Sequence, residues 1–232
     1  MEATPAVLLK GAWYALEQSG NLLRDAIVLY RAKAYSSAVA LAMFGIEELG
    51  KHRMLLQEWR AAQDTGTLPT VEAIKAAQGD HVDKHRWGLR SLLYTPDASS
   101  TVGKAMQTQT KYRPEDEEYQ KSEAAIQDAL NRLAKRVPDA RHSARVSALY
   151  VDLKDSGTEW NRPQDFPQTE SRKLLSECLL DYVMQCEKLR PDPLRNMGDQ
   201  RLAEALEAWN QRPDPPQLFE NTARLLAGSD RE

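Results

Sequence analysis

Apolar residues recur every three or four positions along most of the chain, which is the spacing of one face of an α-helix. The spacing predicts five helical regions, at residues 6–32, 35–59, 71–94, 114–136 and 171–189. The third region is interrupted near Gly79 and Asp80, and the fourth begins with Pro114 and four acidic residues, which suit a helix N-terminus. Residues 95–113 are polar and are expected to be mobile.

Strand character is confined to one short stretch, Leu149 to Leu153, and a turn is expected after it at residues 155–157. The predicted fold is therefore all-α, a helical bundle over residues 1–190 with an irregular or extended segment near residues 149–160. Five prolines follow from Pro191 onward. Residues 191–232 are accordingly predicted to form a Pro-rich C-terminal extension with one or two short helices.

The composition narrows the class of protein. The chain has 232 residues, enough for one large domain with an appendage. Cys178 and Cys186 stand eight residues apart in a predicted helix, too far along it to be bridged, so they are expected to be reduced core residues. No signal peptide and no apolar run of about 20 residues is visible, which predicts a soluble cytoplasmic protein. The net charge of −3 and the pI near 5.9 argue against a general nucleic-acid coat, although they allow a local basic site.

The second predicted helix carries an unexpected pair of carboxylates. Glu47 and Glu48 follow an almost unbroken apolar run from Ala38 to Ile46, and the helical phase leaves neither glutamate on an obviously solvated face. A buried carboxylate is costly unless it is neutralised, paired or bound to a metal. We therefore expect Glu48 to be buried and to pair with a cationic side chain from a different helix.

The same helix carries a stripe of small side chains at Ala38, Ala42 and Gly45, which would let another helix approach closely. The first two helices are expected to form an antiparallel pair. Their remaining apolar surface exceeds what one neighbouring helix would cover, so a symmetric homodimer is expected.

Candidate partners for the carboxylates stand in the third helical region. His81 and His85 are four residues apart and share one face, with Lys84 beside them. If that face packs on the second helix, Glu47 or Glu48 meets one of these three side chains and forms a polar cluster in a largely apolar bundle.

Three interpretations of such a cluster stay open. A metal site is the least favoured, because the chain contains neither Glu-x-x-His nor His-Glu-x-x-His. A second interpretation is a satisfied buried pair that fixes the register of the helices. The third is catalytic: a histidine held by a carboxylate transfers protons, and nearby lysine or arginine stabilises a phosphoryl transition state.

Three segments, in this order along the chain, carry a family resemblance: residues 37–51, which end in Glu-Glu-Leu-Gly-Lys; residues 81–84, His-Val-Asp-Lys; and residues 149–152, Leu-Tyr-Val-Asp. Together they resemble the AbiV family of abortive-infection proteins, within the HEPN superfamily, over about residues 6–189. The resemblance implies an all-α bundle, usually dimeric, that acts in bacterial defence against phage, often by halting growth or translation. It also implies a possible activity, since many HEPN proteins are metal-independent endoribonucleases that use an arginine followed four to six residues later by a histidine.

In this chain only Arg136 and His142 match that spacing, and Pro138 between them is expected to break the helix. The surrounding residues 132–145 include five lysine or arginine residues. The run is either a solvated helix end and loop or a phosphate-contacting patch. The residues of that patch are Arg136, Arg141, His142 and Arg145.

The prediction is a bacterial anti-phage effector of HEPN type that acts on RNA or the translation machinery, by metal-independent cleavage through the RNA 2′-hydroxyl and without a cofactor. His81 or His85 is predicted as the acid/base. Glu48 is predicted to orient that histidine, with Lys51 and Lys84 as charge stabilisers.

Glu47, Tyr150 and Asp152 are assigned supporting roles at the site. For Tyr150 and Asp152 the alternative is structural: a tyrosine that packs over the bundle and an aspartate that caps a turn. The expected partners are RNA or a ribosome-associated target, a second copy of the chain, and a phage-encoded activator or antitoxin, with no membrane. The alternative function is a non-catalytic interaction module that binds a phage or ribosomal protein and whose polar cluster is structural.

Overall fold

The structure is a computed structural model that describes residues 2–79, 81–88, 101–109, 111–113, 115–153 and 156–210. Its helices are α1 (Pro5–Arg31), α2 (Tyr35–Thr65), α3 (Val71–Gly79), α4 (His81–Gly88), α5 (Thr101–Gln109), α6 (Glu117–Leu149), α7 (Gln168–Lys188), α8 (Pro191–Asn196) and α9 (Gln200–Asn210). Two short strands, β1 (Asp152–Leu153) and β2 (Trp160–Asn161), and one 3-10 turn, η2 (Pro163–Asp165), separate α6 from α7. The predicted all-α class is confirmed, and the predicted residues 89–94 of the third helical region lie outside the described part of the chain.

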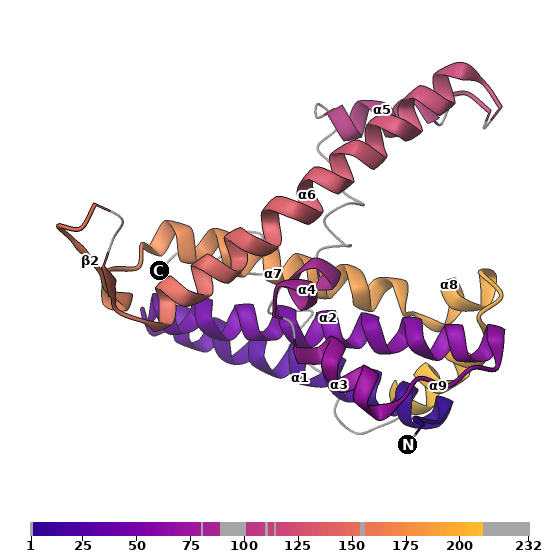
Figure 1. Cartoon of the computed structure of the whole chain (residues 1–232), viewed down its shortest axis with the longest axis horizontal. Coiled ribbons are helices and arrows are strands. Elements are labelled where there is room, and N and C mark those ends of the chain that lie inside the picture. Colours follow the sequence, from indigo (N-terminus) through magenta and orange to yellow (C-terminus); the bar gives the residue numbers. More distant parts are fainter. Residues whose placement is uncertain are drawn as a thin grey trace.

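The antiparallel pair α1 and α2 forms the base of the bundle (Figure 1). The two helices approach each other closely at Gly45 of α2, because a Cβ added there would lie 3.0 Å from Leu23 of α1. At the same place the Ser19 hydroxyl donates a hydrogen bond to the Gly45 carbonyl at 2.7 Å. The small-residue stripe is therefore occupied, at Gly45, by a helix of the same chain.

Helix α7 packs over this pair and completes the core. Tyr182 of α7 is buried and its ring reaches the backbone of α1 at Gly20, where a Cβ would meet the phenol oxygen. Leu175, Cys178 and Leu179 of the same helix are also buried. Cys178 and Cys186 both carry free thiols, as expected from their spacing.

Helix α6 differs most from its predicted form. It begins at Glu117 and continues to Leu149, so the prediction that it ends near Arg136 is wrong, and so is the prediction that Pro138 breaks it. Its C-terminal half crosses the bundle, and its N-terminal half extends away with α5 alongside (Figure 1). Residues 101–109, expected to be mobile, form α5, because the two helices cover each other in this projecting arm.

The segment after α6 contains the predicted extended element. Strands β1 and β2 pair antiparallel, with Asp152 opposite Asn161. After α7, helices α8 and α9 supply the short helices predicted beyond Pro191, and Leu194, Leu202 and Leu206 belong to the same hydrophobic core as α1 and α2. The predicted boundary between residues 190 and 191 stays a prediction.

Candidate functional site

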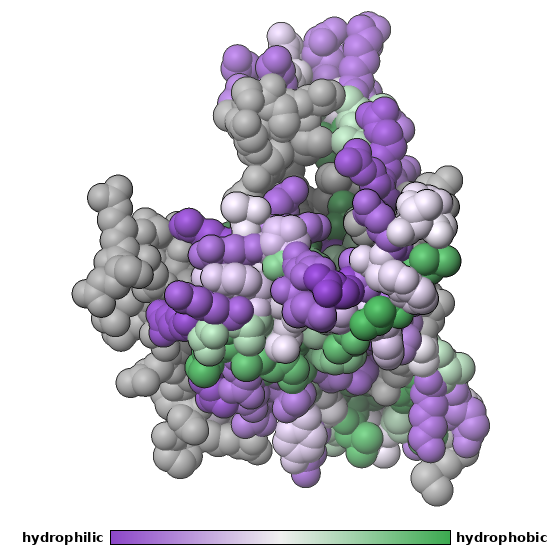
Figure 2. Space-filling model, turned by 90° about the vertical axis from the view of Figure 1, so that its left-hand side faces the viewer, coloured by the Kyte–Doolittle hydropathy of each residue, from purple (hydrophilic) through white to green (hydrophobic). Residues whose placement is uncertain are grey.

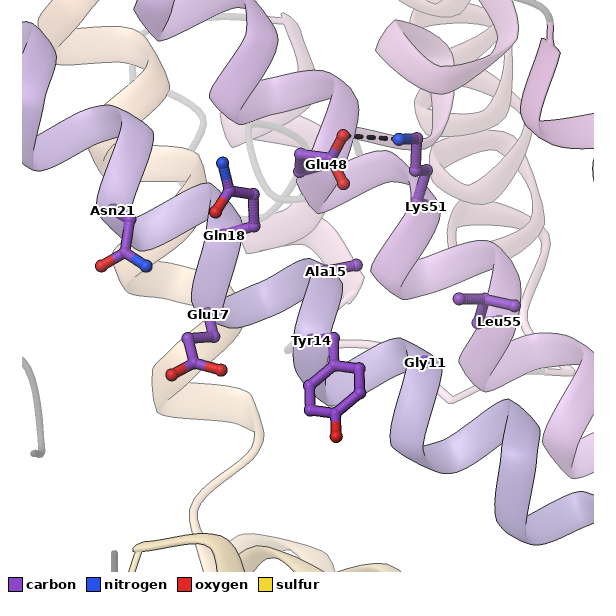
Figure 3. Close-up of a pocket in the computed structure, with 9 residues that line it drawn as sticks. All are labelled: Gly11, Tyr14, Ala15, Glu17, Gln18, Asn21, Glu48, Lys51 and Leu55. Atoms are coloured by element: carbon purple, nitrogen blue, oxygen red, sulfur yellow. Dashed lines mark hydrogen bonds and ion pairs between the residues drawn. The ribbon is translucent and has the colours of Figure 1, made fainter. Parts of the chain in front are cut away.

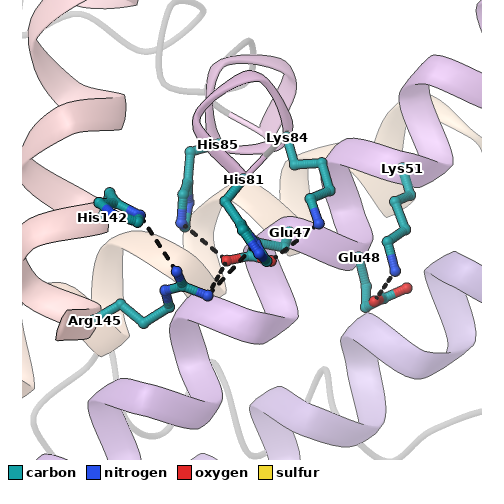
Figure 4. A network of polar contacts seen from close by, with 8 residues as sticks. All are labelled: Glu47, Glu48, Lys51, His81, Lys84, His85, His142 and Arg145. Carbon is teal, nitrogen blue, oxygen red and sulfur yellow. Dashed lines mark hydrogen bonds and ion pairs between the residues drawn. The ribbon is translucent and has the colours of Figure 1, made fainter. Parts of the chain in front are cut away.

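A single buried carboxylate stands at the centre of the polar contacts between α2, α4 and α6 (Figure 4). One oxygen of Glu47, Oε2, lies 2.7 Å from His81 Nδ1 and 3.3 Å from Lys84 Nζ. The other oxygen, Oε1, lies 3.1 Å from Arg145 Nη1 and 3.5 Å from His85 Nε2. We call these five residues the Glu47 cluster. Three segments of the chain that are far apart in sequence therefore meet at one side chain.

The local sequence explains how α4 reaches Glu47. His81, Lys84 and His85 occupy positions i, i+3 and i+4 of α4 and thus share one face. That face lies very close to α2, because α2 has a glycine where the two backbones meet: a Cβ at Gly50 would collide with the Lys84 carbonyl. At the other end of α4, a Cβ at Gly88 would meet Ile46.

Arg145 completes the cluster from α6. Its guanidinium lies 5.6 Å from the centre of the Phe44 ring, a cation–π geometry that holds the side chain against α2. The same guanidinium approaches two histidines, with Nη1 3.5 Å from His81 Nδ1 and Nη2 3.4 Å from His142 Nδ1. His142 is therefore a neighbour of the Glu47 cluster through Arg145.

The charges of the cluster follow from burial and from these contacts. Burial alone would raise the pKa of Glu47, but the neighbouring imidazoles of His85 and His81 and the charge of Lys84 lower it to about 2. Burial lowers the pKa of His85, an effect that Glu47 opposes. Glu47 is therefore an anion at neutral pH, and the cationic side chains of Lys84 and Arg145 face it.

His81 is the most solvent-exposed member of the cluster. Its side chain is 46% exposed, whereas the side chains of Glu47 and Lys84 are each 5% exposed. An imidazole Nδ1–H that donates to a carboxylate leaves the lone pair on Nε2, which is the arrangement of a general base. The geometry thus combines an oriented, accessible histidine with excess positive charge behind it.

Comparison with protein families gives a match over most of this structure, since the HEPN_AbiV model, described as AbiV, matches residues 7–178. The chain belongs to the AbiV family of HEPN proteins. The matched region includes α2, α4 and the part of α6 that bears Arg145, and so contains the whole Glu47 cluster. Neither a curated protein nor a solved structure matches the chain.

In this AbiV protein, Glu48 takes no part in the cluster, and the prediction that it pairs with a cation from another helix is wrong. Its side chain is 22% exposed and pairs with Lys51, three residues along the same helix. Both line a polar pocket between α1 and α2, about 530 Å³ in volume, together with Gln18 and Asn21 (Figure 3). Successive helical residues point about 100° apart, so α4 contacts Glu47 while α1 lies beside Glu48.

The predicted phosphate-contacting patch of this AbiV protein is divided by the structure. Arg141 is 1% exposed and its Nη2 donates to Asp181 Oδ2 of α7 at 2.9 Å, so the prediction that it contacts phosphate is wrong. Arg145 joins the Glu47 cluster. Arg136 is exposed, and His142 is half-buried. Six residues of helix rotate by about 600°, so Arg136 and His142 do not share a face although Pro138 leaves the helix intact.

The two supporting residues after α6 lie away from the cluster. Tyr150 is 59% exposed at the C-terminal end of α6, so it does not pack over the bundle. Asp152 is exposed in β1. Among the described residues, no helix is long and apolar enough to cross a membrane. In the same part of the chain, no group of three or more His, Cys, Asp or Glu residues is arranged to hold a metal ion.

A second buried polar network was missed by the sequence reasoning. His52 of α2 is fully buried, with Nδ1 2.8 Å from the Ala12 carbonyl and Nε2 3.2 Å from Gln185 Nε2. Burial lowers the pKa of His52 to about 4. Arg53 donates from Nε to Gln185 Oε1 at 2.9 Å and from Nη1 to the carbonyl of Gly88 at 2.7 Å. The sequence could have predicted this network, because His52 and Arg53 follow Glu47 and Glu48 on a helix already predicted to be buried.

Proposed function

We propose that this AbiV protein is an anti-phage effector that cleaves RNA by a metal-independent reaction at the Glu47 cluster. Membership of the AbiV family supports the abortive-infection role. The observation that carries the chemical part is the 2.7 Å contact between Glu47 Oε2 and His81 Nδ1, because it orients an accessible histidine for proton transfer.

In the proposed reaction His81 Nε2 removes the proton of an RNA 2′-hydroxyl. The 2′-oxygen attacks the adjacent phosphorus and the bond from phosphorus to the 5′-oxygen breaks. The leaving 5′-oxygen takes a proton from water, so the products carry a 2′,3′-cyclic phosphate and a 5′-hydroxyl. The imidazolium formed at His81 is stabilised by Glu47, which replaces Glu48 in the role first predicted from the sequence.

The remaining residues of the cluster act through charge and position. Lys84 and Arg145 carry two positive charges against the single negative charge of Glu47. This surplus favours a substrate phosphate and stabilises the additional negative charge of the transition state. Arg145, at 13% exposure, is the cation nearer to solvent, while buried Lys84 and His85 hold Glu47 in place. Lys51, paired with Glu48 outside the cluster, has no role in this scheme.

The test is cleavage of a 5′-labelled RNA by the purified protein in the presence of a chelator. The wild type is expected to form products with a 2′,3′-cyclic phosphate, and His81→Ala is expected to lose about 10²–10⁴-fold in rate while its melting temperature changes little. Glu48→Gln is the matched control, since it alters the adjacent carboxylate outside the cluster, and it is expected to cleave at the wild-type rate.

Two results would refute this chemistry. A well-folded His81→Ala protein with full activity would exclude His81 as the acid/base. Cleavage that stops in chelator and returns with added metal would replace the scheme with a metal-dependent one.

A second candidate function, a non-catalytic interaction module, is favoured by an exposed apolar surface at the end of the molecule that bears the β-hairpin. Figure 2 views that end and shows hydrophobic residues exposed between hydrophilic ones. The exposed apolar side chains of this segment are Leu149, Tyr150, Val151, Leu153 and Trp160. A second copy of the chain would cover such a surface, and so would a phage or ribosomal protein. Phage protection without RNA cleavage, abolished by Leu153→Asp, would support this function.

A further inference from the structure

A separate pocket of about 500 Å³ lies between α2, α4, α7 and α8. Its wall consists of Arg53, Leu56, Gln57, Arg60, Trp87, Gln185, Lys188, Leu189, Leu194 and Met197. The volume is within the range of small-molecule sites in proteins. The pocket meets α4 through Trp87, near the opposite end of that helix from His81.

The wall of this pocket is strongly positive for an acidic protein. Among the described residues of the wall, Arg53, Arg60 and Lys188 are cationic and none is acidic, whereas the whole chain has a net charge of −3. Arg60 forms an ion pair at 2.7 Å with Asp199, which is not part of the wall. Asp199 offsets part of the charge of Arg60, and Arg53 and Lys188 are the other cationic side chains of the wall.

The deepest cation is held in a fixed position. Arg53 is 8% exposed, and its Nη1 donates to the carbonyls of Trp87 and Gly88 at 2.6 and 2.7 Å. Gln185 accepts from Arg53 Nε at 2.9 Å. These contacts fix the position of the guanidinium at the wall of the pocket.

The positive charge of Arg53 affects the pKa of Lys188. Burial, and then the positive charge of Arg53, lower the pKa of Lys188 to about 8, while Asp181 opposes the change. Two cations held near each other in a partly buried place are stabilised when an anion enters between them. An anionic ligand would consequently restore the ammonium form of Lys188.

The rest of the wall is suited to an uncharged body. Leu56, Leu189 and Leu194 form an aliphatic surface, and Trp87 offers an aromatic ring. Met197, 68% exposed, stands at the edge with an unbranched, adaptable side chain. Inorganic phosphate alone would leave this surface uncovered.

We propose that the pocket binds a small organic anion, with its acidic group between Arg53, Arg60 and Lys188 and its apolar or aromatic body against Trp87 and the leucines. This site does not depend on the proposed RNA cleavage. An arginine guanidinium suits a phosphate or a carboxylate, since either acid can accept two parallel N–H bonds from it.

Isothermal titration with a matched set of compounds tests the proposal on the full-length protein. The set is 1-naphthyl phosphate, 1-naphthoate, uncharged 1-naphthol and inorganic phosphate. One of the two naphthyl anions is expected to bind at least about tenfold more tightly than either 1-naphthol or inorganic phosphate, because only the anions use both parts of the pocket. The tighter of the two identifies the acidic group.

Two variants locate the binding. Arg60→Ala and Lys188→Met are each expected to weaken the binding of the tighter-binding naphthyl anion about tenfold or more. Arg24→Ala, which removes an exposed arginine of α1 outside the wall of the pocket, is the matched control and is expected to leave binding unchanged.

A proton measurement separates this site from general attraction of anions. At pH 8.5 binding is expected to take up protons, seen as a heat that varies with the ionisation enthalpy of the buffer, and Lys188→Met is expected to abolish the uptake. No binding of either naphthyl anion at millimolar concentration, or equal binding by the wild type, Arg60→Ala and Lys188→Met, would overturn the proposal. If 1-naphthol binds as tightly as the naphthyl anions, the pocket does not recognise an acidic group. If inorganic phosphate binds as tightly as they do, the pocket does not recognise an apolar body.

Discussion

Replacing Glu47 by glutamine keeps the shape of the side chain and removes its charge. The carboxylate has four partners between 2.7 and 3.5 Å, and its pKa falls from 4.5 to about 2. At about 1.36 kcal/mol per pH unit, this difference corresponds to roughly 3 kcal/mol of stability at neutral pH. Removing one partner of a buried ion pair typically lowers the free energy of unfolding by about 3–5 kcal/mol, which agrees with that value.

For a chain of this size about 1 kcal/mol lowers the melting temperature by about 2–4 °C, so Glu47→Gln is expected to melt about 6–12 °C below the wild type. Differential scanning calorimetry at pH 7 measures this. Glu48→Gln is the matched control: its partner Lys51 is three residues away on the same helix and both side chains are partly exposed, so a change within about 0.5 kcal/mol is expected.

The pH dependence adds an independent check on Glu47. A carboxylate with a lowered pKa contributes its stability above the ordinary pKa and loses it as the pH falls toward the folded value. The difference between wild type and Glu47→Gln should therefore be constant above about pH 4.5 and shrink between pH 4.5 and about 2. If Glu47→Gln melts with the wild type, or if Glu48→Gln is equally destabilised, the central role of Glu47 is refuted.

Two further predictions concern His52 and Gly50. Because the folded pKa of His52 is about 4 against an ordinary 6.5, the unfolded state binds more protons between these values, so the free energy of unfolding should fall as the pH is lowered from 6.5 to 4. In urea titrations His52→Gln should flatten that slope by up to about 1.4 kcal/mol per pH unit, and an unchanged slope would contradict the assignment. Gly50→Ala should displace α4 and reduce both stability and RNA cleavage, since its Cβ would collide with the Lys84 carbonyl. Gly79→Ala, with nothing within 4 Å of the added Cβ, is the control that should leave both unchanged or slightly improved, and equal behaviour of the two would refute the close contact of α2 with α4.

Helical periodicity was sufficient to determine the fold class and the main helices. Apolar spacing located both ends of α1 and α7 within a few residues and the start of α2, but α2 continues to Thr65, six residues past its predicted end at Trp59. It also located the face of α4 that carries His81, Lys84 and His85, because positions i, i+3 and i+4 share a face in any α-helix. These properties depend on local geometry, which the sequence alone encodes.

The choice between Glu47 and Glu48 depended on tertiary structure. Their neighbours along the helix are equally apolar, so periodicity shows that both are constrained but not which one meets α4. That choice is made by the contact of α2 with α4 at Gly50 and by the arrival of Arg145 from α6. Those contacts join residues about 35 to 100 positions apart, and no local pattern reports them.

The length of α6 was also decided by tertiary structure. Pro138 removes one backbone donor and disfavours a helix locally, yet the helix continues because its C-terminal half is held against the bundle by Arg141 and Asp181 and by buried Ala148. That packing also buries Arg141, which as part of a basic run looked available to phosphate. The sequence by itself determined the helical class and the positions of the charged residues. The packing of α6 on α2 and α4, with Arg141 paired to Asp181 of α7, decided how far α6 extends and which of its charges solvent can reach.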